Sequence, residues 1–480
     1  LISAFVISRP EASVPMLVRL YQNLQQLPDA YWKEQKVKEV KELIEACGGL
    51  WLEAACNAEY AVQGDTLSLQ VTVNDRAGIT SRLVKVGLQH DPDVTAGQVL
   101  EKNKNLSFVM TKYIDPRLFP LTQPYWLVEK MAQGSYNVSD QKMRGLAQDL
   151  PVLLADFELE IAGANLTFSK PVRYKYTDPV KGELYQPLVI APPVVVSTEP
   201  AILLFRKGQQ QTQSVKVKLA AYRNFSGLPL QLTLRSGTGS QVQLDSSFTL
   251  NKGMSKEYLF TVRPGDSKGL AEDQVRAYAT LPGRRDTVAA YLNVTGIQYD
   301  HIPHIHYYYE DVVKVLNIDL KTAGKRIGYI EGAGDRVPQA LSQMGFEVTL
   351  LKEKDLELDN LTSFDAILTG VRAYNVHAFL ADKYQVLMNY VKGGGNLIVQ
   401  YNTNNFIGTV KSALGPYPFL ISRNRVTDEN AEVKLILPDH PVLNYPNKIT
   451  TADFKGWIQE RGIYFAEGME ANYQTPLSMK

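Results

Sequence analysis

The stretch Thr66-Leu-Ser-Leu-Gln-Val-Thr-Val73 alternates apolar and polar side chains with a period of two. Because successive side chains of a strand point to opposite faces, this pattern is typical of a half-buried antiparallel strand. Further strand-like pieces follow it at 84–89, 157–161 and 172–176. Together they predict a β-sandwich over residues 50–190.

A second alternating region begins after the stiff connector Ala191-Pro-Pro193. Its strand-like pieces are separated by turns rich in Gly, Asn and Ser, which favours a second β-sandwich over residues 191–298. The pieces lie at 201–205, 213–220, 228–234, 256–262, 275–280 and 287–294.

Two helices are predicted before the first sandwich, in residues 1–49. Apolar residues recur at helical spacing from Met16 to Leu27, and Pro28 ends that run. A second run extends from Trp32 and stops at Gly48-Gly49. We expect this helical segment to connect the sandwich to an upstream domain.

The pattern changes again after a predicted linker at 299–319. Strand-like pieces lie at 326–330, 346–351, 364–368 and 397–401, and helical pieces at 337–344 and 380–391. This alternation predicts a doubly wound parallel-sheet domain of the flavodoxin-like or amidotransferase-like class over residues 320–480. A closing strand and helix are expected after Lys480, so we expect this domain to be incomplete at its C-terminus.

Composition restricts the classes of function. The 480 residues include 51 Lys and Arg against 50 Asp and Glu, which gives a net charge of +1 at pH 7. Such a balance provides no overall field that would attract nucleic acid. No apolar run reaches the length of a transmembrane segment. Cys47 and Cys56 are expected to be buried small side chains, with a disulfide or a reactive thiol as the alternative.

His301, His304 and His306 form a histidine cluster in the predicted linker. Three imidazoles at this spacing are weak candidates for binding Zn²⁺ or another borderline metal, together with an acidic neighbour. Catalytic zinc sites usually take their ligands from a helix or from separate strands. An aromatic linker packed between domains is the favoured interpretation, because Tyr307-Tyr-Tyr309 follows directly.

The carboxyl ends of the predicted parallel strands carry the candidate ligand-binding residues, because open α/β sheets bind ligands there. The turn from Gly332 to Asp335 lies between a strand and a helix, where backbone N–H groups can hold an anion or a sugar; turn geometry alone is the alternative. The next turn, 369–374, has no Cys or Ser to act as a nucleophile. We therefore predict no catalytic residue, and as possible ligand-binding residues Gly332, Gly334, Asp335, Arg372, Tyr374, Asn402 and Trp457.

Long strings spread over most of the chain carry a family signal. They are Gln123-Pro-Tyr-Trp-Leu127, Tyr174-Lys-Tyr-Thr-Asp-Pro-Val-Lys-Gly-Glu183, Gly328-Tyr-Ile-Glu-Gly-Ala-Gly-Asp335, Leu368-Thr-Gly-Val-Arg-Ala-Tyr-Asn375, Asn396-Leu-Ile-Val-Gln-Tyr-Asn402, Gly415-Pro-Tyr-Pro-Phe419 and Gly456-Trp-Ile-Gln-Glu-Arg-Gly462. These strings resemble the C-terminal region of large bacterial PIG-L/LmbE-like deacetylases of the Bacteroidetes type.

The resemblance implies a modular periplasmic or exported protein. In that family an N-terminal N-deacetylase domain binds Zn²⁺ or another divalent metal through a His-Pro-Asp-Asp motif and a downstream His. Neither is present in this chain, so no catalytic residue is carried over and no cofactor is expected here. The resemblance also implies an amidotransferase-like domain without its nucleophile, because Gly370, Val371, Arg372 and Ala373 fill the turn where the family's class I relatives have Cys.

The expected function is therefore an accessory one. We expect the chain to position an N-acetylated sugar or glycan for a metal-dependent N-deacetylase. The alternative is a structural or assembly component of a cell-envelope complex that binds a protein partner and has no enzymatic role.

Overall fold

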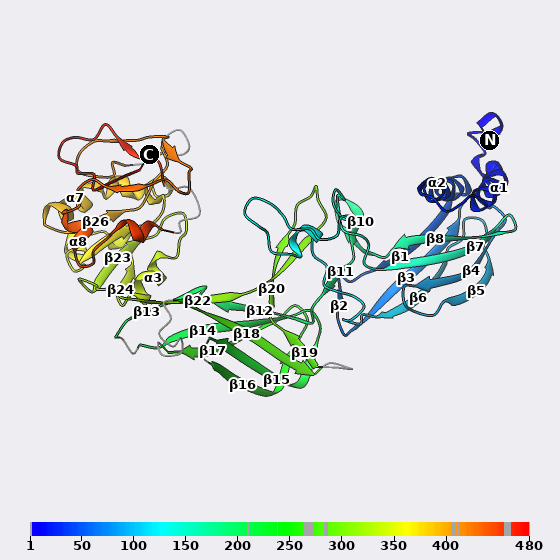
Figure 1. Cartoon of the computed structure of the whole chain (residues 1–480), viewed down its shortest axis with the longest axis horizontal. Helices are drawn as coiled ribbons and strands as arrows, with labels where there is room; N and C mark the ends of the chain where they lie inside the picture. The colour runs from blue at the N-terminus through cyan, green and yellow to red at the C-terminus, as the bar shows by residue number, and fades with distance from the viewer. Residues whose placement is uncertain are drawn as a thin grey trace. The chain divides into compact units, whose positions relative to one another are not determined.

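The computed structural model describes residues 2–208, 211–237, 239–263, 272–282, 287–404, 409–410, 412–455 and 462–479. The chain is rich in β-structure (Figure 1). Its internal contacts divide it into two compact units. Unit 1 comprises Leu1–Pro200, Ser214–Phe260 and Val275–Val313, and unit 2 comprises Ala201–Gln213, Thr261–Gln274 and Lys314–Lys480. The predicted β-rich, multidomain class is confirmed at this level, whereas the individual domain boundaries stay predictions.

Two helices precede the first sandwich, as the sequence predicts. They are α1 (Val14–Gln25) and α2 (Tyr31–Gly48), after two short 3-10 helices at Ile2–Ala4 and Pro10–Ser13. α2 ends at Gly49, whose φ of 60° lies in the left-handed region that favours glycine. Leu17 and Ile44 join the core of the sandwich. No helix in the described part of the chain is long and apolar enough to cross a bilayer.

The first sandwich consists of two sheets around one apolar core. The strand orders are β10-β9-β1-β3-β6 and β5-β4-β7-β8, and β2 pairs in parallel with β11 beside them. In β3, the side chains of Leu67, Leu69 and Val71 are buried, and the residues between them face solvent, which confirms the predicted alternation. The bounds are β1 Leu50–Cys56, β2 Tyr60–Val62, β3 Thr66–Asp75, β4 Ser81–Leu88, β5 Val94–Val99, β6 Leu106–Tyr113, β7 Leu154–Ile161, β8 Ala164–Pro171, β9 Arg173–Asp178, β10 Gly182–Pro187 and β11 Val189–Ala191, with a 3-10 turn at Tyr125–Leu127.

The rest of unit 1 is also built from strands. One sheet has the order β12-β14-β17; in another, β15 pairs with both β16 and β18, and β18 pairs with β19. The bounds are β12 Val194–Glu199, β14 Gln213–Ala221, β15 Phe225–Ser236, β16 Gly239–Leu250, β17 Ser255–Val262, β18 Glu272–Pro282, β19 Thr287–Ala290, β20 Leu292–Ile297 and β21 Ile305–Glu310.

The stretch expected to be a linker contains strands. β21 pairs with β20 in an antiparallel hairpin, from Ile297 opposite Ile305 to Leu292 opposite Glu310. His306 and Tyr308 are buried, whereas their neighbours Tyr307 and Tyr309 are only half-buried. This alternation has the strand period of two, so the aromatic run fits a strand better than a linker.

Unit 2 contains a four-stranded parallel sheet of order β24-β23-β25-β26. The predicted strands and helices of this segment are present, except that the helix expected at 380–391 is divided into two at Lys383. The bounds are β23 Arg326–Ile330, α3 Val337–Gln343, β24 Glu347–Leu350, α4 Leu358–Leu361, β25 Ala366–Thr369, α5 Ala373–Val376, α6 Phe379–Asp382, α7 Tyr384–Lys392 and β26 Asn396–Val399, with a 3-10 turn at Glu353–Asp355.

Unit 2 also has several short paired strands. β13 (Ile202–Arg206) pairs in parallel with β22 (Val312–Ile318). Near the C-terminus, three antiparallel pairs follow: β27 with β31, β28 with β30, and β29 with β32. The bounds are β27 Leu420–Ile421, β28 Arg425–Val426, β29 Val433–Leu435, α8 Pro441–Asn444, a 3-10 turn at Thr451–Phe454, β30 Gly462–Ile463, β31 Ala466–Glu467 and β32 Leu477–Met479.

Both cysteines are free thiols. Cys56 is buried, its Sγ donates to the carbonyl oxygen of Ala58 at 3.2 Å, and burial raises the pKa of the thiol. Cys47, near the end of α2, is half-buried. Neither side chain forms the disulfide that was the alternative interpretation.

Candidate functional site

The turns that follow β23 and β25 pack directly against each other. A Cβ atom on Gly332 would lie 2.1 Å from the carbonyl oxygen of Val371, and the N–H of Ala333 donates to that same oxygen at 2.8 Å. Glycine at 332 is therefore required by a close approach of two backbones. Gly334, with a φ of 109°, supplies the bend that leads into α3.

The carboxylate of Asp335 accepts hydrogen bonds from groups in both turns and from Tyr329. Oδ1 accepts from the hydroxyl of Tyr329 at 2.7 Å and from the N–H of Val337 at 3.0 Å. Oδ2 accepts from the N–H of Val371 at 3.2 Å. Burial, together with the hydrogen bond to Asp335, raises the pKa of Tyr329, so the phenol keeps the proton that it donates. Asp335 therefore links the two turns to each other.

Arg372 lies in the β25–α5 turn with its backbone in the left-handed region, at φ 56° and ψ 26°. Such a conformation costs a non-glycine residue about 1–2 kcal/mol. Its N–H donates to the carbonyl oxygen of Tyr401 at 2.9 Å, and its side chain is exposed. The guanidinium pairs with no carboxylate in the described ranges, so the turn presents a cation at a strained position.

Tyr374 and Asn402 are buried beside this turn. The N–H of Tyr374 donates to Oδ1 of Asn402 at 3.0 Å, and Nδ2 of Asn402 donates to the carbonyl oxygen of Gln400 at 3.0 Å. Tyr374 is 1% exposed, and burial raises the pKa of its phenol to about 12. Both side chains therefore contribute to the packing of the turn, and only Arg372 of this group reaches solvent. Trp457 lies outside the described residues.

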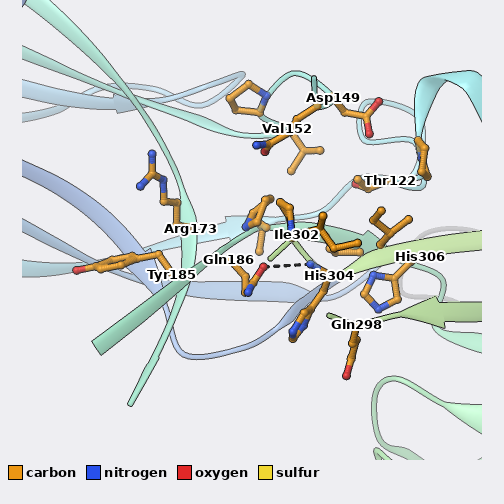
Figure 2. A pocket seen from close by; sticks show the side chains of 18 of the residues that line it. Thr122, Asp149, Val152, Arg173, Tyr185, Gln186, Gln298, Ile302, His304 and His306 are labelled. Carbon is orange, nitrogen blue, oxygen red and sulfur yellow. Dashed lines mark hydrogen bonds between the residues drawn. The ribbon is translucent and has the colours of Figure 1, made fainter. Parts of the chain in front are cut away.

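Unit 1 contains a pocket with a volume of about 1120 Å³. It is lined by four segments that are distant in sequence: the loop at 122–126, the loop at 147–152, residues 171–189 around β9 and β10, and residues 298–306 before and within β21. Figure 2 shows Gln186, His304 and His306 from two of these segments on the same side of the pocket. The candidate histidines His301, His304 and His306 all line this pocket.

His306 has a defined protonation state. Its Nε2 lies 3.0 Å from the hydroxyl oxygen of Tyr60, and burial raises the pKa of this phenol. Burial also lowers the pKa of His306, although Glu59 opposes this change. The phenol and the imidazole therefore share a hydrogen bond, and burial favours the neutral form of the ring. Nδ1 is buried and has no hydrogen-bond partner within the described part of the chain.

His304 and His301 have different neighbours. Nδ1 of His304 lies 3.3 Å from Oε1 of Glu59, and the backbone N–H of His304 donates to Oε1 of Gln186 at 3.1 Å (Figure 2). The ring of His301 lies 5.8 Å from that of Tyr299. Among the residues that the structure describes, no three His, Cys, Asp or Glu side chains are close enough together to hold a metal ion.

The remaining lining combines aromatic rings with polar groups, which is the usual composition of a small-molecule site. Trp126, Tyr176 and Tyr185 supply rings. Arg173 is exposed and forms no ion pair with a described carboxylate. Asp149 accepts from the N–H of Tyr125 at 2.8 Å, and burial raises the pKa of its carboxyl.

Sequence reasoning missed most of these pocket residues. Arg173, Gln186 and Asp149 come from separate parts of the chain, and none has a local pattern that marks it as functional. Besides the histidine cluster, the strings 123–127 and 174–183 are the sequence signals that point to this region.

No protein-family model matches the chain, and no curated protein matches it. Among solved structures, the C-terminal domain of Wzt is 8% identical over 32% of this chain and 81% of that chain, with a TM-score of 0.15. A DUF4785 family protein from Legionella pneumophila is 15% identical over 50% of this chain and 55% of that chain, with a TM-score of 0.16. Similarities at these TM-scores support no argument about fold or function.

Proposed function

We propose that this chain is the non-catalytic, substrate-positioning part of a PIG-L/LmbE-like metal-dependent N-deacetylase, and that the pocket of unit 1 binds its N-acetylated glycan. The observation that supports the proposal is the pocket of about 1120 Å³, which combines aromatic rings with unpaired polar groups on a β-scaffold. The divalent metal belongs to the deacetylase domain, and the whole protein acts in the periplasm or outside the cell.

The lining suits a sugar because sugar rings present both C–H faces and hydroxyl groups. Aromatic side chains such as Trp126 offer large flat surfaces for the C–H faces. Hydroxyl and acetamido oxygens need donors, and the guanidinium of Arg173 has donors that no described carboxylate uses. Oε1 of Gln186 accepts a hydrogen bond from the backbone N–H of His304, which leaves the NH₂ group of Gln186 to donate to a ligand.

The parallel-sheet part of unit 2 takes a secondary role in this proposal. We assign it to the flavodoxin-like, amidotransferase-like class without a nucleophile, on the basis of its strand order and of Arg372 in the turn after β25. Arg372 would contact a carboxylate or hydroxyl of a ligand. It would do so as a binding residue, because the turn holds no group that attacks a substrate.

Calorimetric titration of the intact chain with N-acetylglucosamine tetrasaccharide tests the glycan site. A glucose tetrasaccharide of the same β-1,4 linkage is the matched control, since it differs only in having a hydroxyl group in place of each acetamido group. We expect the acetylated sugar to bind more tightly, and Arg173→Ala to weaken its binding about tenfold, as the loss of a charged hydrogen bond would do. Arg372→Ala removes the same type of side chain from the other candidate region, the turn after β25 in unit 2. Comparing the two variants therefore shows which region binds the sugar. A larger effect of Arg372→Ala would move the site to unit 2, and no binding of any acetylated glycan would refute the glycan role.

The link to a deacetylase is tested by the mass of the protein as its natural source makes it. A mass above 53.7 kDa by about one or two domains, very roughly 20–40 kDa, supports a catalytic domain in the same polypeptide. A mass equal to that of this chain leaves the glycan pocket in place but contradicts the deacetylase.

A second candidate function is assembly with a protein partner in a cell-envelope complex. Val242 and Leu244 lie on the same face of β16 and are 50% and 77% exposed, and Leu259 on β17 is 60% exposed. Exposed apolar groups on a strand favour contact with another protein. Capture of a defined envelope protein that Leu244→Lys abolishes, with no response to any sugar, would favour this function.

A further inference from the structure

A second hollow adjoins the pocket of unit 1. It has a volume of about 480 Å³ and is lined by Tyr125, Trp126, Tyr136, Arg144 and Leu146, among others. Trp126 and Ala147 line both the hollow and the larger pocket. Both spaces therefore adjoin the same indole ring, although their other lining residues differ.

The loop that forms the hollow is held by its own hydrogen bonds. The hydroxyl of Tyr125 donates to the carbonyl oxygen of Leu146 at 3.2 Å, and its N–H donates to Asp149 at 2.8 Å. Nη2 of Arg144 donates to the carbonyl oxygen of Val138 at 2.9 Å. The ring of Trp126 lies edge-on to that of Tyr125, with their centroids 4.9 Å apart. The hydrogen bonds hold the loop on both sides of Trp126, and Tyr125 packs against the indole, so less of this region has to be ordered when a ligand binds.

We propose that this hollow is a further subsite of the glycan site, so that the ligand is an oligosaccharide chain whose successive units pass across Trp126 from one space to the other. This inference rests on the proposed function, because it concerns the length of the ligand that the same site accepts. It identifies the ligand class as a linear glycan with several units and excludes a single sugar as the full ligand.

The lining of the two spaces supports a chain. The larger pocket, at about 1120 Å³, already exceeds the volume of typical ligand sites, about 300–1,000 Å³, and it shares the flat indole ring of Trp126 with the hollow. Tyr136 is 55% exposed and adds a second exposed ring to the lining of the hollow. Arg144 uses one nitrogen for the loop and keeps other N–H groups for the hydroxyls of a sugar unit.

Titration of the intact chain with N-acetylglucosamine oligomers of two, four and six units tests the inference. We expect affinity to rise with length in the unaltered protein. Tyr136→Ala should lower the affinity for the hexasaccharide about tenfold and leave that for the disaccharide unchanged. Trp126→Ala should weaken the binding of every oligomer, because the indole belongs to both subsites. Tyr31→Ala, at another exposed tyrosine, is the matched control and should change nothing.

Two results would overturn the subsite. One is equal affinity for the disaccharide and the hexasaccharide; the other is a length dependence that Tyr136→Ala leaves intact. This second result matters because a longer oligosaccharide can bind one site in more registers, which raises its affinity without any second subsite. Such an increase would not depend on Tyr136. In either case the short oligomers still bind, so the proposed function stands. Absence of binding at every length would instead refute the proposed function, and the subsite with it.

Discussion

The buried hydrogen bond between Tyr60 and His306 makes the stability of unit 1 depend on pH. Burial lowers the pKa of His306, whereas the ring titrates near pH 6.5 in the unfolded chain. Below about pH 6.5 the unfolded chain therefore binds a proton that the folded chain does not. The contribution of this histidine is fully present above that pH and is lost as the pH falls toward the lowered folded value. The slope is at most about 1.4 kcal/mol per pH unit.

We expect His306→Gln to reduce this pH dependence, because an amide side chain can still form a hydrogen bond with Tyr60 but does not titrate. Denaturant unfolding of unit 1 at about pH 7.5 and about pH 5.5 measures the difference between the two free energies of unfolding. His301→Gln is the control, since that ring is exposed in the same segment. An unchanged pH dependence in His306→Gln would show that the ring is not held neutral.

Asp335 is expected to stabilise unit 2 rather than to bind a ligand. Its carboxylate satisfies the hydroxyl of Tyr329 and the backbone N–H groups of Val337 and Val371. Asp335→Ala should cost about 2–3 kcal/mol, because it leaves buried donors without a partner. Asp335→Asn keeps one acceptor and should cost less. The free energy of unfolding measures both, and a loss of glycan affinity without a loss of stability would contradict this assignment.

The contact between the β23–α3 and β25–α5 turns depends on a glycine at one position. Gly332→Ala places a methyl group 2.1 Å from the carbonyl oxygen of Val371, so the two turns must separate. At Gly334 an added Cβ meets nothing within 4 Å, and the cost is limited to the backbone strain at φ 109°, about 1–2 kcal/mol. We expect Gly332→Ala to lower the melting temperature of unit 2 more than Gly334→Ala does. The opposite order would mean that the turns are not packed as described.

Local patterns predicted most helices and strands but failed where pairing decides the structure. α1, α2 and β3 follow from spacing alone, because each buries one face of its own periodic sequence. The sequence predicts a linker where β21 lies, because the strand pattern of the second sandwich ends before it and the pattern of the parallel-sheet domain begins after it. Its strand character depends on β20, which supplies the hydrogen bonds from the other arm of the hairpin.

The candidate site was predicted less well than the elements. The histidine cluster was recognised as unusual, and it lines the pocket. Gln186 and Arg173 acquire their place only when β9 and β10 meet the segment before β21, a contact between residues more than 100 positions apart. No local rule contains that information. For Asp335 the sequence alone does not separate two roles, because a carboxylate in a strand–helix turn has the same local pattern whether it binds a ligand or backbone N–H groups of its own chain.

The chain as a whole is expected to unfold in more than one step. The core around Leu69 and Phe157 belongs to unit 1, and the core around Ile367 and Leu387 belongs to unit 2. Separate cores favour separate transitions. Hydrogen exchange during unfolding of the intact chain should show Asp335→Ala loosening only unit 2 and acidification loosening unit 1 through His306. A single transition in which both units exchange together would contradict this expectation.

The state of the two thiols makes the protein convenient for chemical labelling. Burial shields Cys56 and raises the pKa of its thiol, so Cys56 is expected to react slowly with maleimides. Cys47 is half-buried and is therefore the more accessible of the two thiols. Replacing Cys47 with serine would leave a background close to zero without touching the pocket. A fluorophore attached to a cysteine introduced at the exposed Ser135, beside Tyr136, would then report in real time whether a sugar chain reaches the second hollow.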